Sequence, residues 1–252
     1  MSKVYFIMLH KDEEVAKEVF SQLTKMGLSI DGHFYKDDLE NMGWVSFKKE
    51  LEGGGYKAWI ILGTKEDWER PSIRQGLSLL EIGKEPSIKT ILLFPSGKSP
   101  QKEELPPVFR GSEMVEMDSG FAAKVVAKVH LPVGKEIVPY RITPYGVPGM
   151  GLWLEIGPAK GVWKGVLIGV KDAEIRHMGI GERGRLPERS VLEYPVRDMK
   201  LEVNGEEYIA WAVKNEISSS TSAFVNVSKV PTFILFGEWR EEALECYNLS
   251  LL

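Results

Sequence analysis

The sequence predicts a two-domain chain in which an α/β domain with an open parallel sheet precedes an all-β domain, a sandwich or a barrel. Strand-like apolar runs alternate with helix-period stretches through the first half, an order typical of a parallel sheet covered by helices. Short apolar runs separated by turn residues fill the second half, with almost no helical periodicity. At 252 residues the chain also exceeds one typical domain of about 150 residues. We expect the α/β domain over residues 1–133, a Pro- and Gly-rich linker over 134–151, and the all-β domain over 152–252.

The elements of the first half follow one another as strand and helix about five times. The clearest pair is the apolar run VYFIML and the helical spacing of apolar residues from Val15 to Met26, which Gly27 ends. Nearly continuous apolar runs such as YKAWIIL indicate strands covered on both faces, so we expect a flavodoxin-like sheet with helices on each side. Strands are expected at residues 4–9, 28–30, 56–62, 90–94 and 114–117, and helices at 15–26, 44–51, 73–82 and 121–129.

The second half is typical of short antiparallel strands. Two of them flank Asn204-Gly205, a dipeptide that accepts the positive φ of a tight turn, so residues 199–213 predict a β-hairpin. The last twelve residues, EEALECYNLSLL, predict a short amphipathic helix that packs back on the sheet or supports a dimer. Further strands are expected at residues 152–156, 162–170, 173–178, 223–227 and 232–236.

Composition excludes several classes of protein. A net charge of −4 and a pI near 5.7 lack the basic excess of a nucleic-acid binder. The single cysteine, Cys246, cannot form an intrachain disulfide, which suits a reducing, cytoplasmic compartment. The N-terminal apolar run is too short for a signal peptide, and no stretch approaches the roughly 20 apolar residues of a membrane span. The histidines lack metal-ligand spacing, so no metal site is expected.

Polar and aromatic residues follow the strands of the predicted parallel sheet, where such a sheet binds ligands. His10 and Lys11 come after the first strand, Asp38 belongs to the segment after the second, and Trp68 follows the third. These loops converge on one edge of the sheet, so they predict a cleft for a polar ligand. The alternative is a solvated rim in which Asp12 only caps the first helix.

The first half resembles the TIR (Toll/interleukin receptor) domain family over about residues 3–131. The segment YFIMLHKDEEVAKEVFSQLTKMGLSID is similar to the family's opening strand, helix and second strand. DDLENMGWVSFKKELEGGGYKAWIILGTKEDW resembles its acidic loop, its helix and the buried strand leading to a tryptophan-containing loop, here with Trp68. MVEMDSGFAAKVVAKV is similar to the closing strand and helix. The resemblance implies a signalling or defence-type protein that binds itself or another TIR-like protein.

The resemblance also implies where a catalytic acid would stand. Active members of the family cleave NAD with a glutamate on the helix after the third strand, and here Ser72, Gln75 or Gly76 falls in that place. Cleavage builds positive charge on the ribose, which a carboxylate stabilises and a glutamine does not. Glu69 and Glu81 are the nearest carboxylates. Residues 75 and 81 diverge by roughly 120° around a helix, so Glu81 is a poor substitute for an acid at position 75.

Three functional hypotheses follow. The first is a TIR-like interaction protein that self-associates through polar loops around residues 37–43, while the all-β domain senses a partner or ligand. The second is an NAD-cleaving enzyme in which Glu69 or Glu81 supplies the acid. The third is a nucleotide-binding module without turnover. In the latter two, the residues expected to contact NAD or another nucleotide are His10, Lys11, Asp38, Trp68 and Gln75.

Three patterns in the second half have ordinary explanations. Gly179–Gly184 satisfies GxGxxG, but Pro187 follows where a dinucleotide site needs a helix, so a flexible hairpin loop is expected. The basic residues between 176 and 189 predict surface ion pairs with neighbouring glutamates, with anion or nucleotide sensing as the alternative. Residues 218–222 lack the glycines of a nucleophile elbow and predict a polar loop.

Overall fold

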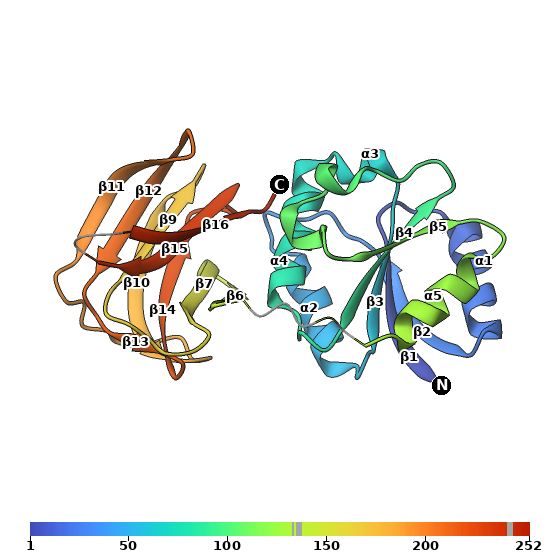
Figure 1. Cartoon of the computed structure of the whole chain (residues 1–252), viewed down its shortest axis with the longest axis horizontal. Helices are drawn as coiled ribbons and strands as arrows, with labels where there is room; N and C mark the ends of the chain where they lie inside the picture. Colours follow the sequence, from blue (N-terminus) through green and yellow to red (C-terminus); the bar gives the residue numbers. More distant parts are fainter. Residues whose placement is uncertain (133, 135–137, 241–243) are drawn as a thin grey trace. The chain divides into compact units, whose positions relative to one another are not determined.

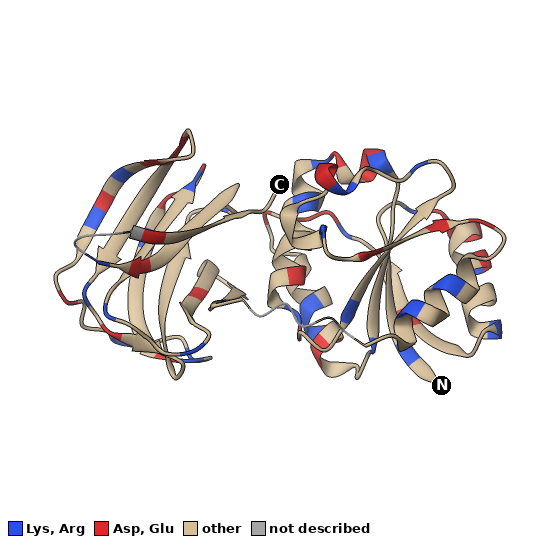
Figure 2. Ribbon diagram, in the orientation of Figure 1, with Lys and Arg blue, Asp and Glu red and all other residues tan. Residues whose placement is uncertain are grey.

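The chain divides into two compact units, Met1–Lys135 and Glu136–Leu252 (Figure 1). The computed structural model describes residues 1–132, 134, 138–240 and 244–252. The first unit is α/β with a parallel sheet and the second is built from antiparallel strands, so the predicted fold class is confirmed. Figure 2 shows acidic and basic residues interspersed in both units. That each unit folds as an independent domain stays a prediction.

Five parallel strands form the sheet of the first unit, in the order β2-β1-β3-β4-β5. The central strands β1, β3 and β4 are almost entirely buried, because helices cover both faces of the sheet. Their near-continuous apolar sequences therefore agree with their place in the centre of the sheet, where both faces are covered. The strands are β1 (Ser2–Met8), β2 (Leu28–Phe34), β3 (Ala58–Leu62), β4 (Lys89–Pro95) and β5 (Glu113–Met117).

Helices α1 (Glu13–Lys25) and α5 (Phe121–His130) cover one face of this sheet (Figure 1). Their apolar sides form one core with alternate strand residues, for example Leu23 and Val125 with Ile60. Asp12 caps α1, since its carboxylate accepts hydrogen bonds from two backbone N–H groups of the first turn. Helices α2 (Trp44–Gly53) and α4 (Pro71–Gly83) cover the other face, joined by the short α3 (Lys65–Trp68) and the 3-10 turns η1 (Lys102–Glu104) and η2 (Pro107–Phe109).

Two antiparallel sheets make up the second unit, in the orders β10-β14-β7-β6 and β11-β12-β9-β15-β16, with a small β13-β8 pair. Tyr140 of β6 packs against Phe236 of β15, which links the two sheets. Two separate sheets correspond to the sandwich rather than the barrel. The strands are β6 (Tyr140–Val147), β7 (Gly151–Pro158), β8 (Val162–Trp163), β9 (Val166–Lys171), β10 (Ile175–Glu182), β11 (Val196–Val203), β12 (Glu206–Val213), β13 (Ile217–Ser218), β14 (Thr221–Val227), β15 (Phe233–Trp239) and β16 (Leu244–Ser250).

The hairpin predicted at Asn204-Gly205 joins β11 and β12. Both residues have positive φ, 55° for Asn204 and 78° for Gly205, as a two-residue hairpin turn requires. Part of the predicted linker 134–151 is instead a strand, β6, although it contains Pro144. Among the described strands β6 lies at the edge of its sheet and pairs with β7 alone, a position where a proline costs no ladder hydrogen bond. Residues 135–137 of that linker, and residue 133 just before it, lie outside the described residues.

Two other expectations for the second unit are wrong. The C-terminal segment forms strand β16 rather than a helix, because pairing with β15 satisfies its backbone hydrogen bonds; residues 241–243 lie outside the described residues. Gly179 and Gly181, expected in a flexible loop, belong to β10 and pair with β14. Pro187 packs over both glycines, where added Cβ atoms would lie 2.9 and 3.0 Å from its ring. Close packing against Pro187 therefore accounts for two of the three glycines of the GxGxxG pattern, and the third, Gly184, has a positive φ of 78°.

No helix among the described ranges combines the length and apolar character needed to cross a membrane.

Candidate functional site

The strand order brings the loops after β1 and β3 together at the carboxyl edge of the parallel sheet. The chain leaves β1 toward β2 on one side and returns to β3 on the other, and open α/β sheets bind ligands in such a crevice. His10 comes from the first loop and Asp67 from α3, after β3. Nδ1 of His10 lies 2.9 Å from Oδ2 of Asp67, whose side chain is 12% exposed. The sequence indicated His10 at this edge but not its partner.

Asp67 is held in place by a capping box at the start of α3. The backbone N–H of Thr64 donates to Oδ2 of Asp67 (2.8 Å), and the Thr64 hydroxyl accepts from the Asp67 backbone N–H (3.4 Å). The pattern Thr-x-x-Asp was therefore the sequence signal for this residue. In the neutral tautomer with its proton on Nδ1, His10 donates to Asp67 and its Nε2 can accept a hydrogen bond. The contact with Asp67 orients the His10 ring at this edge of the sheet.

The loop after β2 lies against the start of α4, where the TIR resemblance places the catalytic acid. Oδ2 of Asp37 accepts hydrogen bonds from Nη2 of Arg70 (2.5 Å) and Oγ of Ser72 (2.8 Å). The Tyr35 hydroxyl fills the space beside Gly76, since a Cβ on Gly76 would lie 2.1 Å from it. Burial raises the pKa of Tyr35, and the charge of Asp37 raises it further. A neutral hydroxyl group therefore occupies the space beside Gly76.

Gln75 and Glu81 both lie on α4 but in different surroundings. Gln75 is buried near the start of the helix, at 9% exposure. Glu81 pairs with Lys84 (3.0 Å) and accepts a hydrogen bond from the Thr90 hydroxyl (2.6 Å). Thr90 lies near the beginning of β4, so Glu81 stands at the amino edge of the sheet, and burial raises its pKa. Because α4 runs back toward the amino edge, the structure does not place Glu81 beside Trp68, and its role as an acid stays a prediction from the sequence.

Lys11 and Asp38 make contacts within their own loops. Lys11 is exposed and forms a loose ion pair with Glu13 at 3.7 Å. Asp38 accepts a hydrogen bond from Nδ2 of Asn41 (2.8 Å), which is the main cause of its lowered pKa, and its backbone carbonyl accepts from Gly43 (2.7 Å). These local contacts stabilise a turn, and the structure pairs neither residue with His10.

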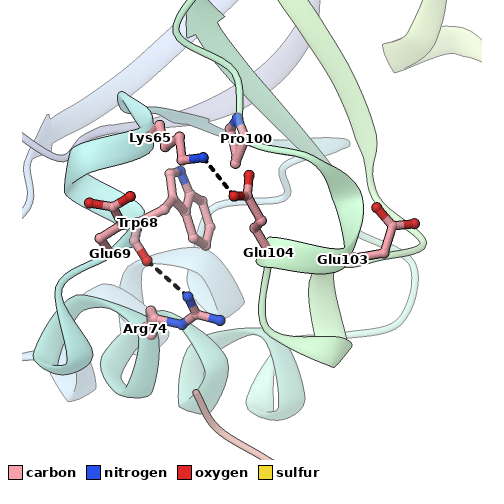
Figure 3. A pocket seen from close by; sticks show the side chains of 7 residues that line it. All are labelled: Lys65, Trp68, Glu69, Arg74, Pro100, Glu103 and Glu104. Atoms are coloured by element: carbon pink, nitrogen blue, oxygen red, sulfur yellow. Dashed lines mark hydrogen bonds and ion pairs between the residues drawn. The ribbon is translucent and has the colours of Figure 1, made fainter.

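A cavity of about 380 Å³ lies beside Trp68 (Figure 3). Trp68 is only 1% exposed and packs edge-on against Phe109, with ring centres 5.1 Å apart. Nζ of Lys65 pairs with Oε1 of Glu104 at 2.6 Å, joining α3 to the segment after β4. Of the residues expected in a site, Trp68 and Glu69 line this cavity. Its full lining is Lys65, Trp68, Glu69, Arg74, Pro100, Glu103 and Glu104.

The second unit contains an ion pair between Arg141 and Glu155, and both side chains make further hydrogen bonds within the protein. Arg141 lies 3.3 Å from Glu155 and donates to the carbonyls of Ser218 (2.8 Å) and Thr221 (2.9 Å). Glu155 also accepts from the Ser222 hydroxyl at 2.6 Å. Residues 218–222, expected as a polar loop, are thus the end of β13, a two-residue turn and the start of β14, and Arg141 holds this turn by its hydrogen bonds. This network stabilises the fold.

Within the described ranges, no three His, Cys, Asp or Glu side chains gather so as to hold a metal ion. The arginines at 176, 183, 185 and 189 lie on β10 and the segment after it, and all are exposed. In the part of the chain that the structure describes they form none of the ion pairs expected with Glu174, Glu182 and Glu188. Charge repulsion from Arg183 contributes, after burial, to lowering the pKa of Arg141.

No family model matches the sequence, and no curated protein matches it. Among solved structures, the chain is similar to CpaE of Burkholderia thailandensis, described as a pilus assembly protein, with 12% identity over 51% of this chain and 98% of that chain and a TM-score of 0.36. It is similar to a two-domain esterase active on acetylated mannans, with 9% identity over 99% of this chain and 89% of that chain and a TM-score of 0.35. These likenesses are too distant to carry an argument about activity. The TIR resemblance stays a prediction from the sequence.

Proposed function

We propose that this chain is a TIR-like interaction protein whose α/β unit binds through the carboxyl edge of its sheet and does not cleave NAD. The observation that carries the proposal is the packing of the Tyr35 hydroxyl against Gly76. The three positions that the resemblance assigns to an acid hold neutral residues: Gln75 is buried, Gly76 faces Tyr35, and Ser72 donates to Asp37. The carboxylate of Asp37 lies beside Ser72 but already accepts hydrogen bonds from Ser72 and Arg70, so positive charge developing on a ribose would find no carboxylate at the three assigned positions themselves.

NAD cleavage is the second candidate, and Glu69 is the residue that favours it. Glu69 follows Trp68 directly and lines the same cavity. Glu69 is exposed to solvent. In Figure 3 its carboxylate is turned away from Arg74 and Glu104. A catalytic carboxylate is more effective in a site that excludes water, so this placement supports the non-cleaving proposal.

The full chain should release no nicotinamide from NAD above the rate in protein-free buffer, measured by chromatography. Release that is abolished by Glu69→Ala and retained by Glu103→Ala would contradict the proposal. Glu103 is the matched control, because it is an exposed glutamate lining the same cavity.

Self-association is tested on the same sample by light scattering. We expect a dimer or a larger species that Glu40→Arg, in the exposed loop after β2, shifts toward monomer. Glu14→Arg on α1 is the matched charge reversal and should leave the mass unchanged. A monomer at every concentration, or equal effects of the two variants, counts against the proposed surface.

A further inference from the structure

Arg74 is a half-buried cation without a carboxylate partner. It extends from α4 into the cavity beside Trp68 (Figure 3). Its Nη1 donates to the Trp68 carbonyl at 3.3 Å, near the outer limit of a hydrogen bond, and its Nε is buried with no partner. No acidic side chain of the described ranges forms an ion pair with it. A guanidinium carries five donors, and the structure shows one protein acceptor for Arg74, the Trp68 carbonyl.

The other charges around the cavity do not compensate Arg74. Glu104 is engaged by Lys65, and the carboxylates of Glu69 and Glu103 point away from Arg74 in Figure 3. Arg110 adds a second positive charge nearby and donates to the backbone carbonyls of Leu105 and Glu103. Burial and then the charge of Arg110 lower the pKa of Arg74. A bound anion would stabilise the charged guanidinium against both its burial and the repulsion from Arg110.

The indole of Trp68 supplies a second unused donor. Its Nε1 is buried and has no hydrogen-bond partner, although the residue lines the same cavity. Buried N–H groups are rarely left without an acceptor, because each has lost its hydrogen bond to water. Arg74 and Trp68, the two residues that carry these unpartnered groups, both line this cavity.

We propose that this cavity binds a small molecule through an oxyanion, a carboxylate or a phosphate group, with Arg74 as the anion-binding residue. Its volume of about 380 Å³ falls within the roughly 300 to 1,000 Å³ typical of small-molecule sites. The planar fork of a guanidinium matches two oxygens of either anion. The site lies between α3, α4 and the segment after β4, and neither His10 nor Asp67 is among the residues that line it. The proposal of an anion site does not depend on whether the protein cleaves NAD.

Titration of the isotope-labelled full chain tests this site by nuclear magnetic resonance. Inorganic phosphate and acetate are added separately at constant ionic strength, with chloride as the reference anion. The chain has seven tryptophans, and Trp68→Phe identifies the Trp68 indole signal; the Nε–H signal of Arg74 gives an independent reading in the wild type. We expect both signals to shift saturably with at least one oxyanion and not with chloride. The anion that binds more tightly identifies the ligand group as phosphate or carboxylate.

Variants of Arg74 distinguish specific anion binding from a general effect of salt. Arg74→Gln should weaken binding about tenfold or more, and Arg74→Lys should weaken it less, because it keeps the charge and loses the fork. Arg176→Gln, an exposed arginine of the second unit, should bind as the wild type does. The proposal is overturned if neither signal shifts, if the response never saturates, or if folded Arg74→Gln and Arg74→Lys both bind as the wild type does.

Discussion

Replacing Glu155 with glutamine should strongly destabilise the second unit, because this carboxylate is the acceptor at the centre of a buried network. Its side chain is 3% exposed and accepts hydrogen bonds from the Ser222 hydroxyl (2.6 Å), the Tyr145 hydroxyl (2.5 Å) and the Gly184 backbone N–H (3.0 Å). Arg141, 11% exposed, also lies against it at 3.3 Å. In Glu155→Gln the arginine keeps its charge inside the sandwich and loses the counter-charge.

The expected loss follows from the burial of both partners. Removing one member of a buried ion pair costs about 3 to 5 kcal/mol, and the lower end applies because the glutamine oxygen still accepts hydrogen bonds. For a unit the size of Glu136–Leu252, each kcal/mol lowers the melting temperature by about 4 °C. The melting transition of this unit should therefore fall by about 12 °C.

Calorimetry measures the transition, and the far-UV helix signal identifies the melting of the first unit, which holds the α-helices of the described ranges. The double variant Arg141→Met/Glu155→Gln should recover part of the lost melting temperature, because it removes the unpaired positive charge of Arg141. Glu174→Gln, an exposed change in the same unit, should have little effect. A Glu155→Gln protein within about 1 kcal/mol of the wild type would refute the account of this network as a buried ion pair.

Two further predictions concern the first unit. Gly76→Ala should destabilise it by about 1 to 3 kcal/mol in chemical denaturation, because the new Cβ would lie 2.1 Å from the Tyr35 hydroxyl, and this clash outweighs the helix preference of alanine. Adding Tyr35→Phe should reduce the loss of stability. An unchanged loss would show that the clash with the hydroxyl is not its cause. Burial of Glu50 favours a raised pKa, but hydrogen bonds from Tyr5 and His33 outweigh it and the pKa is lowered. A carboxyl whose folded pKa is lowered stabilises the protein above its unfolded pKa of about 4.3 and less as pH falls below it. The difference in unfolding free energy between wild type and Glu50→Gln should therefore shrink from neutral to acidic pH, and a constant difference would argue against this role.

The parallel sheet could be predicted because its strands carry their own signal. β3 and β4 are buried on both faces, which requires the apolar runs around residues 58–62 and 89–95. Edge strands carry a weaker signal, since one side or one face meets solvent. β6 contains a proline and β16 follows a polar segment, so composition alone pointed to a linker and a helix.

The candidate site could be predicted only at the level of its loops. His10 and Trp68 follow strands whose carboxyl ends share an edge, and this placement follows from strand order alone. Arg74 could not be identified in this way, because an arginine in an amphipathic helix is ordinary until its neighbours are known. Its missing counter-charge depends on Glu104 pairing with Lys65, 39 residues away in sequence.

The sequence by itself determined the α/β class of the first unit, the antiparallel class of the second and the hairpin at Asn204-Gly205, because periodicity and turn chemistry act between near neighbours. The tertiary structure alone decided which polar groups meet: His10 with Asp67, Tyr35 with Gly76, and Arg141 with Glu155. Those contacts depend on distance and burial between segments far apart in the chain, quantities that local sequence patterns do not encode.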